Sequence, residues 1–297
     1  MRRRAYRTHL AGLLVLAALG WEGWGGQTPR LVVTDDANRA VSLAHPARRI
    51  VSLSPATTEL LFALGAGDRV VGRTTWCDYP AEATLVPSVG DGLNPNIEAI
   101  AARRPDLVVL YRSTLDLRAA QQLLQLDIPA LVLKQDRLED LARAAQLISR
   151  LTDDTMAGDS IARVMLATAR TPASALGISI AFVTWDNPPI VIGRDSYLDQ
   201  LASLAGARNV FHDMAAASSI VSLETIAVRD PDILVTIADS AERHPEPPAY
   251  VRAPAWQAIR AVREHRFVVL GGSLFGHPSP RADSAVRELR QMLRGAR

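Results

Sequence analysis

Cysteine and aromatic residues are scarce in this sequence. Its 297 residues include one cysteine, Cys77, and aromatic side chains make up 5% of the chain. A single cysteine excludes an internal disulfide, so packing must supply the stability of the fold. The 48% of hydrophobic residues is typical of a globular protein with a sizeable core.

The sequence also lacks the common catalytic motifs. It contains neither a G-x-x-x-x-G-K-[ST] phosphate-binding loop nor a G-x-S-x-G nucleophile elbow. Its six histidines are scattered, without an H-E-x-x-H motif or a cysteine–histidine cluster that would favour a zinc site. We therefore expect no catalytic residues, no metal ligands and no cofactor. A hydrolase that pairs Cys77 with a histidine is the distant alternative.

Residues 1–26 have the layout of a secretory signal peptide. The apolar run Leu10–Leu19 follows four arginines: Arg2, Arg3, Arg4 and Arg7. This run is half the length of a membrane-spanning helix, which needs about 20 residues. Because no cysteine follows the run, we expect export without a lipid anchor. The absence of disulfides in an exported chain favours a bacterial periplasm.

The basic character of the chain comes from this first segment. The whole sequence has 33 basic and 31 acidic side chains and a pI near 9.0. Because residues 1–26 hold four arginines and one acid, the remainder carries 29 basic and 30 acidic side chains. The exported part is thus close to neutral, which gives no support for nucleic-acid binding.

Short aliphatic runs alternate with helical patterns along the chain. Several runs are apolar at nearly every position, as expected for strands buried on both faces. The predicted strands are Ile50–Leu53, Val70–Gly72, Leu107–Leu110, Ala130–Leu133, Ser179–Val183, Asp232–Ile237 and Phe267–Leu270. The predicted helices include Thr57–Leu64, Ile97–Arg103, Asp116–Leu126 and Tyr197–Leu204. This alternation predicts an α/β fold with mainly parallel sheets.

The sequence contains an internal repeat of one helix–strand unit. The stretch "NIEAIAARRPDLVV" starts at Asn96, and "SLETIAVRDPDILV" starts at Ser222. An earlier pair, "LLFALGAGDRVV" from Leu60 and "QLASLAGARNVF" from Gln200, occurs in the same order. Two ordered matches indicate two similar α/β lobes.

The middle of the chain has helical periodicity and no predicted strand. Apolar positions recur there at helical spacing, and Thr171-Pro172 ends the pattern, since the residue before proline avoids the helical region. We therefore predict that a long helical segment divides the chain near its middle, with several strands on each side. The expected boundaries are 27–152 for the N-terminal lobe, 153–172 for the linking helix and 173–297 for the C-terminal lobe.

Both copies of the repeated unit keep a glutamate, Glu98 or Glu224, and a Pro-Asp pair. Proline ends the helix and aspartate begins the turn into the strand, which explains the pair without any function. A glutamate in the first helical turn stabilises the helix dipole by about 0.3–1 kcal/mol. This structural explanation of the glutamates stays open beside a functional one.

Large aromatic residues follow several predicted strands. Trp76 lies in "TTWCDYP", Tyr111 ends one strand, and Trp185 follows another. Phe275 and His277 lie in "GGSLFGHPSPR" after the last strand. Ligands of α/β proteins bind beyond the carboxyl ends of strands, and aromatic faces suit a large, partly apolar ligand. Ordinary packing is the alternative for each aromatic alone.

These stretches resemble the periplasmic substrate-binding proteins that serve ABC importers of cobalamin, haem and ferric siderophores. Cobalamin-binding members are the most alike. The resemblance rests on a serine-proline after the first strand, the Trp-Cys-Asp-Tyr-Pro loop, the glutamate-bearing helix and the "SPR" before the last helix. It covers nearly all of the chain after the signal peptide.

The resemblance implies two lobes bridged by a single long helix. It also implies a monomer that captures cobalamin between its lobes and delivers it to an ABC importer. It implies ligand contacts from six residues: Trp76, Tyr111, Trp185, Ser273, Phe275 and His277. It also implies that Glu98 and Glu224 dock against arginines of the two permease subunits.

Two departures from the cobalamin pattern keep the ligand open. Gly92 stands near a position where the family pattern has a tryptophan, and His277 replaces an arginine of the last ligand loop. A histidine facing a metal macrocycle is a candidate axial ligand, so haem stays an alternative. A ferric siderophore is a second alternative ligand, although no arginine cluster favours it. A different class of function is also open, in which the same two lobes form a sensor or scaffold subunit.

Overall fold

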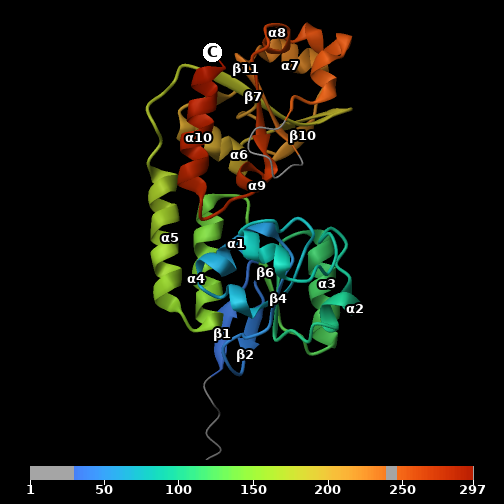
Figure 1. The fold of residues 1–297 in the computed structure, drawn as a ribbon, viewed down its shortest axis with the longest axis vertical. Coiled ribbons are helices and arrows are strands. Elements are labelled where there is room, and N and C mark those ends of the chain that lie inside the picture. The colour runs from blue at the N-terminus through green and yellow to red at the C-terminus, as the bar shows by residue number, and fades with distance from the viewer. Residues whose placement is uncertain (1–29, 239–245, 297) are drawn as a thin grey trace, which may run out of the picture.

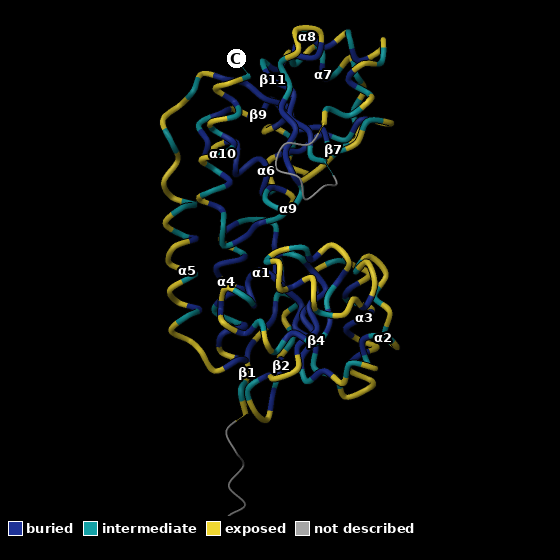
Figure 2. The backbone as a smooth tube through the Cα atoms, in the orientation of Figure 1, coloured by how far each residue is buried: buried dark blue, intermediate teal, exposed yellow. Residues whose placement is uncertain are grey.

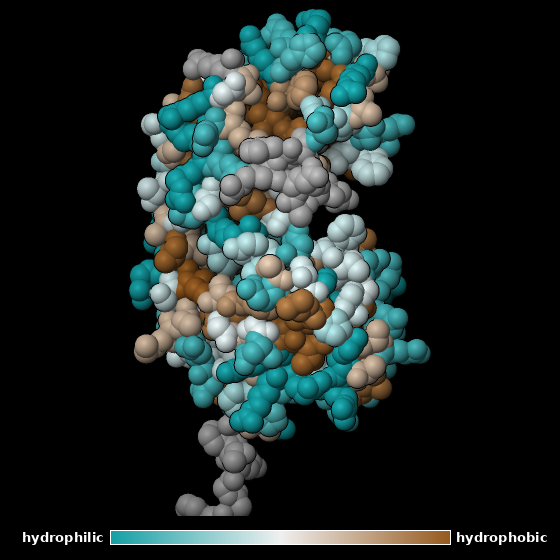
Figure 3. Space-filling model, in the orientation of Figure 1, coloured by the Kyte–Doolittle hydropathy of each residue, from teal (hydrophilic) through white to brown (hydrophobic). Residues whose placement is uncertain are grey.

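The computed structural model describes residues 30–238 and 246–296. The predicted signal peptide lies outside the described residues. Two lobes are stacked along the long axis of the molecule, and α4 (Leu138–Thr152) and α5 (Thr155–Arg170) run along one side (Figure 1). Within these ranges no helix is both long and apolar enough to cross a membrane. On the face drawn in Figure 3, apolar side chains show as patches on each lobe between polar surfaces.

The N-terminal lobe is built on a four-stranded, fully parallel sheet of order β4-β3-β5-β6. Its strands are β3 (Ile50–Ser52), β4 (Val70–Arg73), β5 (Leu107–Tyr111) and β6 (Ala130–Leu133). The lobe also contains α1 (Pro55–Ala63), α2 (Ile97–Ala101), α3 (Thr114–Gln125) and the 3₁₀ turns η1 (Gly67–Arg69) and η2 (Ala81–Leu85). Every residue of β3 and β6 is buried, because helices cover both faces of the sheet. Figure 2 shows dark blue, buried backbone in the middle of this lobe, beside the label of β4.

The C-terminal lobe has a mixed sheet of order β10-β8-β7-β11-β12, with β9 paired to β7. Its strands are β7 (Ser179–Asp186), β8 (Pro189–Ile192), β9 (Arg208–Asn209), β10 (Ser218–Ile220), β11 (Ile233–Ala238) and β12 (Phe267–Gly271). Its helices are α6 (Tyr197–Ala205), α7 (Leu223–Arg229), α8 (Arg260–Arg263), α9 (Gly272–Phe275), α10 (Ala282–Gly295), η3 (Ala249–Arg252) and η4 (Pro254–Ala258). β7, β11 and β12 are parallel, whereas β8 and β10 form an antiparallel edge.

The predicted α/β class with mainly parallel sheets is confirmed. The antiparallel edge of the second sheet and the hairpin of β1 (Leu31–Thr34) and β2 (Ala40–Leu43) are additions that the sequence pattern did not predict. Pro189 stands at the first position of β8, where a missing N–H is tolerated but the strand signal is weak.

The helical middle of the chain folds back on itself. α4 ends at Asp153 in the left-handed conformation (φ 62°), and α5 begins after Asp154, whose carboxylate accepts the N–H of Ala157 at 3.2 Å. A Cβ at Gly158 would stand 2.0 Å from Ser149 Oγ, so only glycine lets the two helices approach this closely.

The helix predicted at 153–172 is therefore α5, one of a pair. Ala162 and Met165 pack in the N-terminal core, and Ala169 packs against the C-terminal core. Residues 171–178 then lead to β7 without further helix or strand. Contacts with both cores give α5 the position expected of a connection between lobes.

The repeated stretch forms the same unit in each lobe. α2 begins after Asn96, whose Oδ1 accepts the N–H of Ala99 at 3.0 Å. α7 begins after Ser222, whose Oγ accepts the N–H of Thr225 at 3.2 Å. Each helix is N-capped by its side chain and leads into a strand of its sheet, β5 or β11.

The Pro-Asp pair of each unit also has matching contacts. The Asp106 carboxylate accepts the N–H groups of Arg48 and Arg49 at 2.9 Å each, just before β3. The Asp232 carboxylate accepts the N–H of Ser179 at 2.9 Å and its hydroxyl at 2.8 Å, where β7 begins. The aspartate thus does more than begin a turn, because it fixes the unit to the neighbouring strand.

Candidate functional site

Two adjoining cavities lie between the lobes at the carboxyl ends of the parallel strands. The larger has a volume of about 670 Å³ and the smaller about 370 Å³. Both are bordered by Ile192, Leu198, Gly276 and His277, so they form one continuous cleft. This is the place at which open α/β sheets bind ligands.

Two tryptophans from different lobes line the larger cavity. Trp76 follows β4 and is 51% exposed, and Trp185 lies near the end of β7 and is 58% exposed. Trp185 Nε1 donates to the carbonyl oxygen of Asn187 at 3.0 Å, which holds the ring at the start of the β7–β8 turn. Indole rings left this exposed at a cavity offer flat apolar surface to a ligand.

A buried cysteine anchors the loop that carries Trp76. Cys77 is 1% exposed, and its Sγ lies 3.0 Å from the hydroxyl oxygen of Thr58 and 3.2 Å from that of Thr74. Because Cys77 points inward, its neighbours Trp76 and Asp78 reach the cleft. Among the described residues, no histidine hydrogen-bonds to the thiol, so the nucleophile pair that a hydrolase needs is not formed.

A tyrosine and an aspartate border the smaller cavity. Tyr111 Oη donates to Asp136 Oδ1 at 2.6 Å. Burial, followed by this hydrogen bond, raises the pKa of the Tyr111 hydroxyl well above its usual value. Tyr111 therefore stays neutral throughout the physiological range, and its hydrogen bond to Asp136 fixes the position of the ring beside the cavity.

Polar contacts cross between the lobes beneath the cleft. The buried Glu59 of α1 accepts Arg281 Nε at 2.9 Å and Arg281 Nη2 at 2.5 Å. His277 Nε2 lies 3.0 Å from Glu59 Oε1. The Arg281 guanidinium also lies 3.6 Å from the centre of the Tyr79 ring, a cation–π contact.

A second cross-lobe contact joins two cavity-lining residues. Ser273 Oγ, in the C-terminal lobe, donates to Asp78 Oδ1, in the N-terminal lobe, at 3.1 Å. The cleft is therefore already held in one geometry by contacts across its floor, and a ligand would enter a preformed site.

A family model described as "Periplasmic binding protein" matches residues 50–274. The chain belongs to this family. The uncharacterized ABC transporter substrate-binding lipoprotein YvrC of Bacillus subtilis is 27% identical over 274 residues, 89% of this chain and 85% of that protein. A vitamin B12-binding protein of Vibrio parahaemolyticus is 26% identical over 249 residues, 82% of this chain and 89% of that protein.

The solved structures include binders of another ligand. The periplasmic haem-binding protein RhuT from Roseiflexus sp. RS-1 in its apo form superposes with a TM-score of 0.73 at 22% identity, over 84% of this chain and 99% of that one. This likeness shows the fold. This periplasmic binding protein therefore acts in transport-related binding of a small molecule, and its ligand is not specified by its relatives.

Most of the ligand-contacting residues predicted for this periplasmic binding protein meet at the cleft. Trp76, Trp185, Ser273 and His277 line the larger cavity, and Tyr111 lines the smaller. Phe275 is the exception. It is 1% exposed and packs within the C-terminal core, because α9 turns its ring under the cleft instead of into it.

The two predicted docking glutamates lie away from the cleft, one on each lobe. Glu98 is in the first turn of α2 and Glu224 in the first turn of α7, and both are exposed. Neither makes an ion pair with another described residue. Hydrogen bonding from Ser222, then from the backbone, lowers the pKa of the Glu224 carboxyl. The helices α2 and α7 of this binding protein therefore each present an accessible carboxylate in their first turn.

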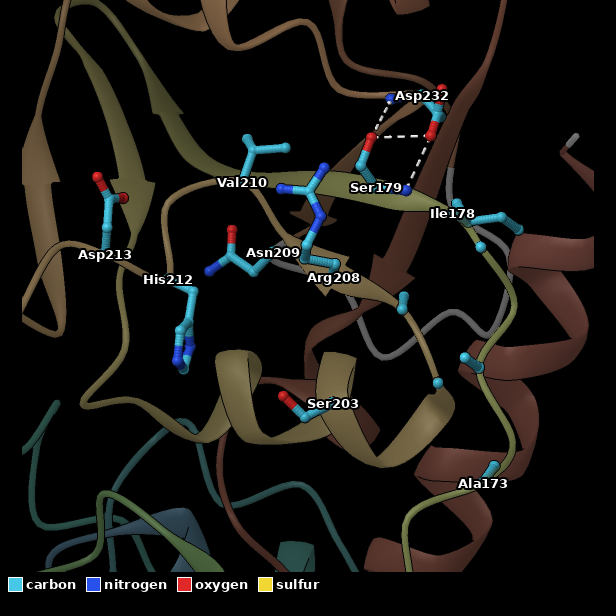
Figure 4. Close-up of a pocket in the computed structure, with 14 residues that line it drawn as sticks. Ala173, Ile178, Ser179, Ser203, Arg208, Asn209, Val210, His212, Asp213 and Asp232 are labelled. Carbon is cyan, nitrogen blue, oxygen red and sulfur yellow. Dashed lines mark hydrogen bonds between the residues drawn. The ribbon is translucent and has the colours of Figure 1, made fainter.

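A larger cavity of this binding protein lies elsewhere. It measures about 860 Å³ and is lined by one lobe only, near Ser179 and Asp232 at the amino ends of β7 and β11 (Figure 4). Its side chains include Arg208 and His212, and His212 Nδ1 lies 2.9 Å from the buried Asp199 carboxylate. None of the exposed tryptophans borders it, so the cleft is the stronger candidate site.

Sequence reasoning missed the charged residues of the cleft. Glu59 could have been noticed, since it is a single acid in the otherwise apolar stretch "TTELLFALG". Asp136 and Asp195 follow no such pattern, and only the fold brings them to the smaller cavity.

Among the described residues, no group of three or more His, Cys, Asp or Glu side chains is arranged to hold a metal ion.

Proposed function

We propose that this periplasmic binding protein captures cobalamin, or a related corrinoid, in the cleft and delivers it to an ABC importer. The observation that carries the proposal is the pair Trp76 and Trp185, one from each lobe, both half exposed at one cavity. A corrin is a large, partly apolar macrocycle, and flat aromatic surfaces suit it. The similarity to a vitamin B12-binding protein of Vibrio parahaemolyticus supports this choice.

The polar atoms around the tryptophans suit the rim of a corrin. Asp78, Thr184 and Ser273 border the larger cavity, and hydroxyl and carboxylate oxygens accept hydrogen bonds from amide groups. Binding of this kind breaks no covalent bond, so we expect a carrier and not an enzyme.

Equilibrium titration with cyanocobalamin tests the proposal. Saturable binding with a 1:1 stoichiometry is expected, together with quenching of tryptophan fluorescence. If no binding is measured at high micromolar cyanocobalamin, the corrinoid proposal is wrong.

Haem is the second candidate, because His277 borders both cavities and a haem-binding protein has the same fold. Its Nε2 is already engaged by Glu59, which leaves Nδ1 as the nitrogen free to coordinate iron. Haem titration of the wild type and of His277→Ala decides this. A Soret band that shifts on binding to the wild type and not to the variant would favour haem.

Glu98 and Glu224 are proposed to dock the loaded protein onto the two permease subunits. An accessible carboxylate at the same place in two matching helices, one helix on each lobe, suits a partner that is itself made of two halves. The glutamates lie outside both cleft cavities, so their role is separable from ligand binding.

We further propose export by the N-terminal segment, no lipid anchor, and a monomer in solution. The absence of a cysteine after the apolar run supports the unanchored form. Because a similar protein of Bacillus subtilis is a lipoprotein, fractionation is the test. Recovery in the periplasmic fraction without detergent is expected, and recovery only with the membranes would contradict it.

A further inference from the structure

The charged residues that line the cleft are mostly acidic. Asp78 borders the larger cavity, and Asp136 and Asp195 border the smaller. Within the described ranges, no arginine or lysine lines either cavity. His277 is the one basic side chain of the lining in those ranges, and its Nε2 is engaged by the Glu59 carboxylate.

Two cations near the cleft, Arg281 and Lys134, already have partners. Arg281 bonds to both oxygens of Glu59, donates to the carbonyl oxygen of Ser273 at 2.6 Å and stacks on Tyr79. Lys134 Nζ lies 3.6 Å from Asp136 and 3.4 Å from Asp140. A ligand anion would therefore have to compete with existing partners for these two cations. The exposed Arg112 and Arg194 are neighbours of Tyr111 and Asp195 in the chain but line neither cavity.

The three acids differ in how far they are compensated. Asp136 accepts a hydrogen bond from Tyr111 and lies near Lys134. Among the described residues, Asp78 accepts a side-chain hydrogen bond from Ser273 alone. Asp195 is exposed, and no described residue forms an ion pair with it. Asp195 thus carries the least compensated charge at the cleft. An alternative role of Asp195 is structural, because a negative charge just before the N-terminus of α6, which begins two residues later, interacts favourably with the helix dipole.

An unpartnered hydroxyl at the same cavity also points to a polar ligand group. Tyr197 lines the smaller cavity and is 5% exposed, yet its Oη has no hydrogen-bond partner among the described residues. Buried hydroxyls are nearly always hydrogen-bonded, so this atom lacks a partner that a ligand or water can supply.

We infer that Asp78, Asp136 and Asp195 make the cleft selective for ligands whose rim carries amide N–H donors, and against ligands whose rim carries carboxylates. Carboxylate oxygens accept hydrogen bonds from amides, whereas a carboxylate held beside them is repelled and loses water without gaining a partner. The inference rests on the proposed corrinoid function. It specifies that the cleft distinguishes ligands by the amide or carboxylate groups on their rim.

Two corrins of the same ring allow a matched test. Dicyanocobinamide carries amides around its rim, and dicyanocobyrinic acid carries carboxylates at those positions. We expect the wild type to bind the amide form at least about 100-fold more tightly at low salt. The ratio should fall as the salt concentration rises, because salt screens exposed charges. Equal affinity for the two corrins would overturn the inference.

Asparagine variants assign the selectivity to residues. Asp195→Asn, and more strongly the variant with Asp78→Asn, Asp136→Asn and Asp195→Asn together, should tighten binding of the acid form and narrow the ratio by about tenfold or more. Asp68→Asn, an exposed acid on η1 outside the cleft lining, is the matched control and should leave the ratio unchanged. A triple variant that folds normally by circular dichroism and keeps the wild-type ratio would also overturn the inference.

Failure of the proposed function would look different. If neither corrin nor cyanocobalamin binds and haem does, the corrinoid proposal is wrong. The charge selectivity is then measured with haem and with haem whose propionates are converted to amides. Tighter binding of the amidated haem supports the inference, and equal or weaker binding overturns it.

Discussion

The two lobes repeat one helix–strand unit, but they reach the cleft with different residues. On their outer surfaces α2 and α7 match in N-cap, in the place of Glu98 and Glu224 and in the Pro-Asp pair that follows. At the cleft, the N-terminal lobe offers Trp76 on a loop anchored by a buried cysteine. The C-terminal lobe offers Trp185 on a strand end. The lobes are alike where a partner with two similar halves would dock, and they differ where an unsymmetrical ligand would bind.

Removing both glutamates should give the largest effect, a loss of transport, because it removes the feature that the two lobes share on their outer surfaces. Glu98→Ala with Glu224→Ala is expected to lower transport into vesicles that contain the importer by about 100-fold, as expected when two charge pairs at an interface are lost. Ligand affinity should stay within about twofold, since neither residue lines the cleft.

Single variants sharpen the result. Each should impair transport less than the double variant, and Asp68→Ala should not impair it. If the ligand affinity of the double variant falls together with its transport, the glutamates belong to the fold or the pocket.

The next test concerns the cleft, where the two lobes differ. Trp76→Ala and Trp185→Ala should each weaken cyanocobalamin binding by about 30- to 100-fold, the usual effect of truncating an aromatic hot spot. Leu124→Ala, an exposed apolar residue of α3 outside both cleft cavities, is the control for loss of surface hydrophobicity. Calorimetric titration measures all three. Unchanged affinity in both tryptophan variants would remove the aromatic basis of the site.

The matching aspartates test whether the repeated unit is equally important in both lobes. Asp106→Ala and Asp232→Ala each leave strand-end N–H groups without their acceptor, which costs about 1–3 kcal/mol of unfolding free energy. Urea denaturation should show both losses. A loss in only one lobe would mean that the unit is shared in sequence but not in energetic role.

Asp232 also predicts a dependence on pH. Burial alone would raise the pKa of its carboxyl, but hydrogen bonds from Ser179 and Arg260 outweigh burial and lower it. A folded-state pKa below the unfolded value contributes stability above the unfolded pKa, near 4, and this stability is lost as the pH falls through the folded pKa. The stability difference between wild type and Asp232→Asn should therefore shrink below about pH 4. A difference that is constant from pH 7 to pH 3 would contradict this.

The smallest expected effect is at Cys77. Its thiol is buried against two threonines, so labelling with a thiol reagent should be slow in the native protein and fast in urea. Cys77→Ser should retain ligand binding and hence the position of Trp76. Rapid labelling of the native protein would reopen the hydrolase alternative.

Much of the fold follows from local patterns. All seven predicted strands fall on strands with parallel neighbours, because a run such as Leu107–Leu110 is apolar on both faces and has few alternatives. The sequence pattern did not predict β8, because Pro188 precedes it and Pro189 is its first residue. It did not predict β1 and β2, because they are short and half exposed. Strand pairing at an antiparallel edge depends on tertiary contacts that no local window contains.

The cleft was less predictable than the fold. Trp76, Tyr111 and Trp185 could be placed because they follow strands, and strand ends converge on one edge of a sheet. Phe275 follows a strand as well, yet it is buried, since the direction of a side chain in the short helix α9 depends on how that helix packs. The pairing of Glu59 with Arg281 joins residues 222 positions apart and needed the structure.

The central claim is that the two tryptophans of different lobes hold one corrinoid between them. Titrating the purified protein with cyanocobalamin, while following tryptophan fluorescence in the wild type and in Trp76→Ala with Trp185→Ala, tests it most directly. The account predicts saturable 1:1 binding with strong quenching in the wild type and a loss of both in the double variant. Absence of binding to the wild type, or equal binding by the double variant, would contradict it.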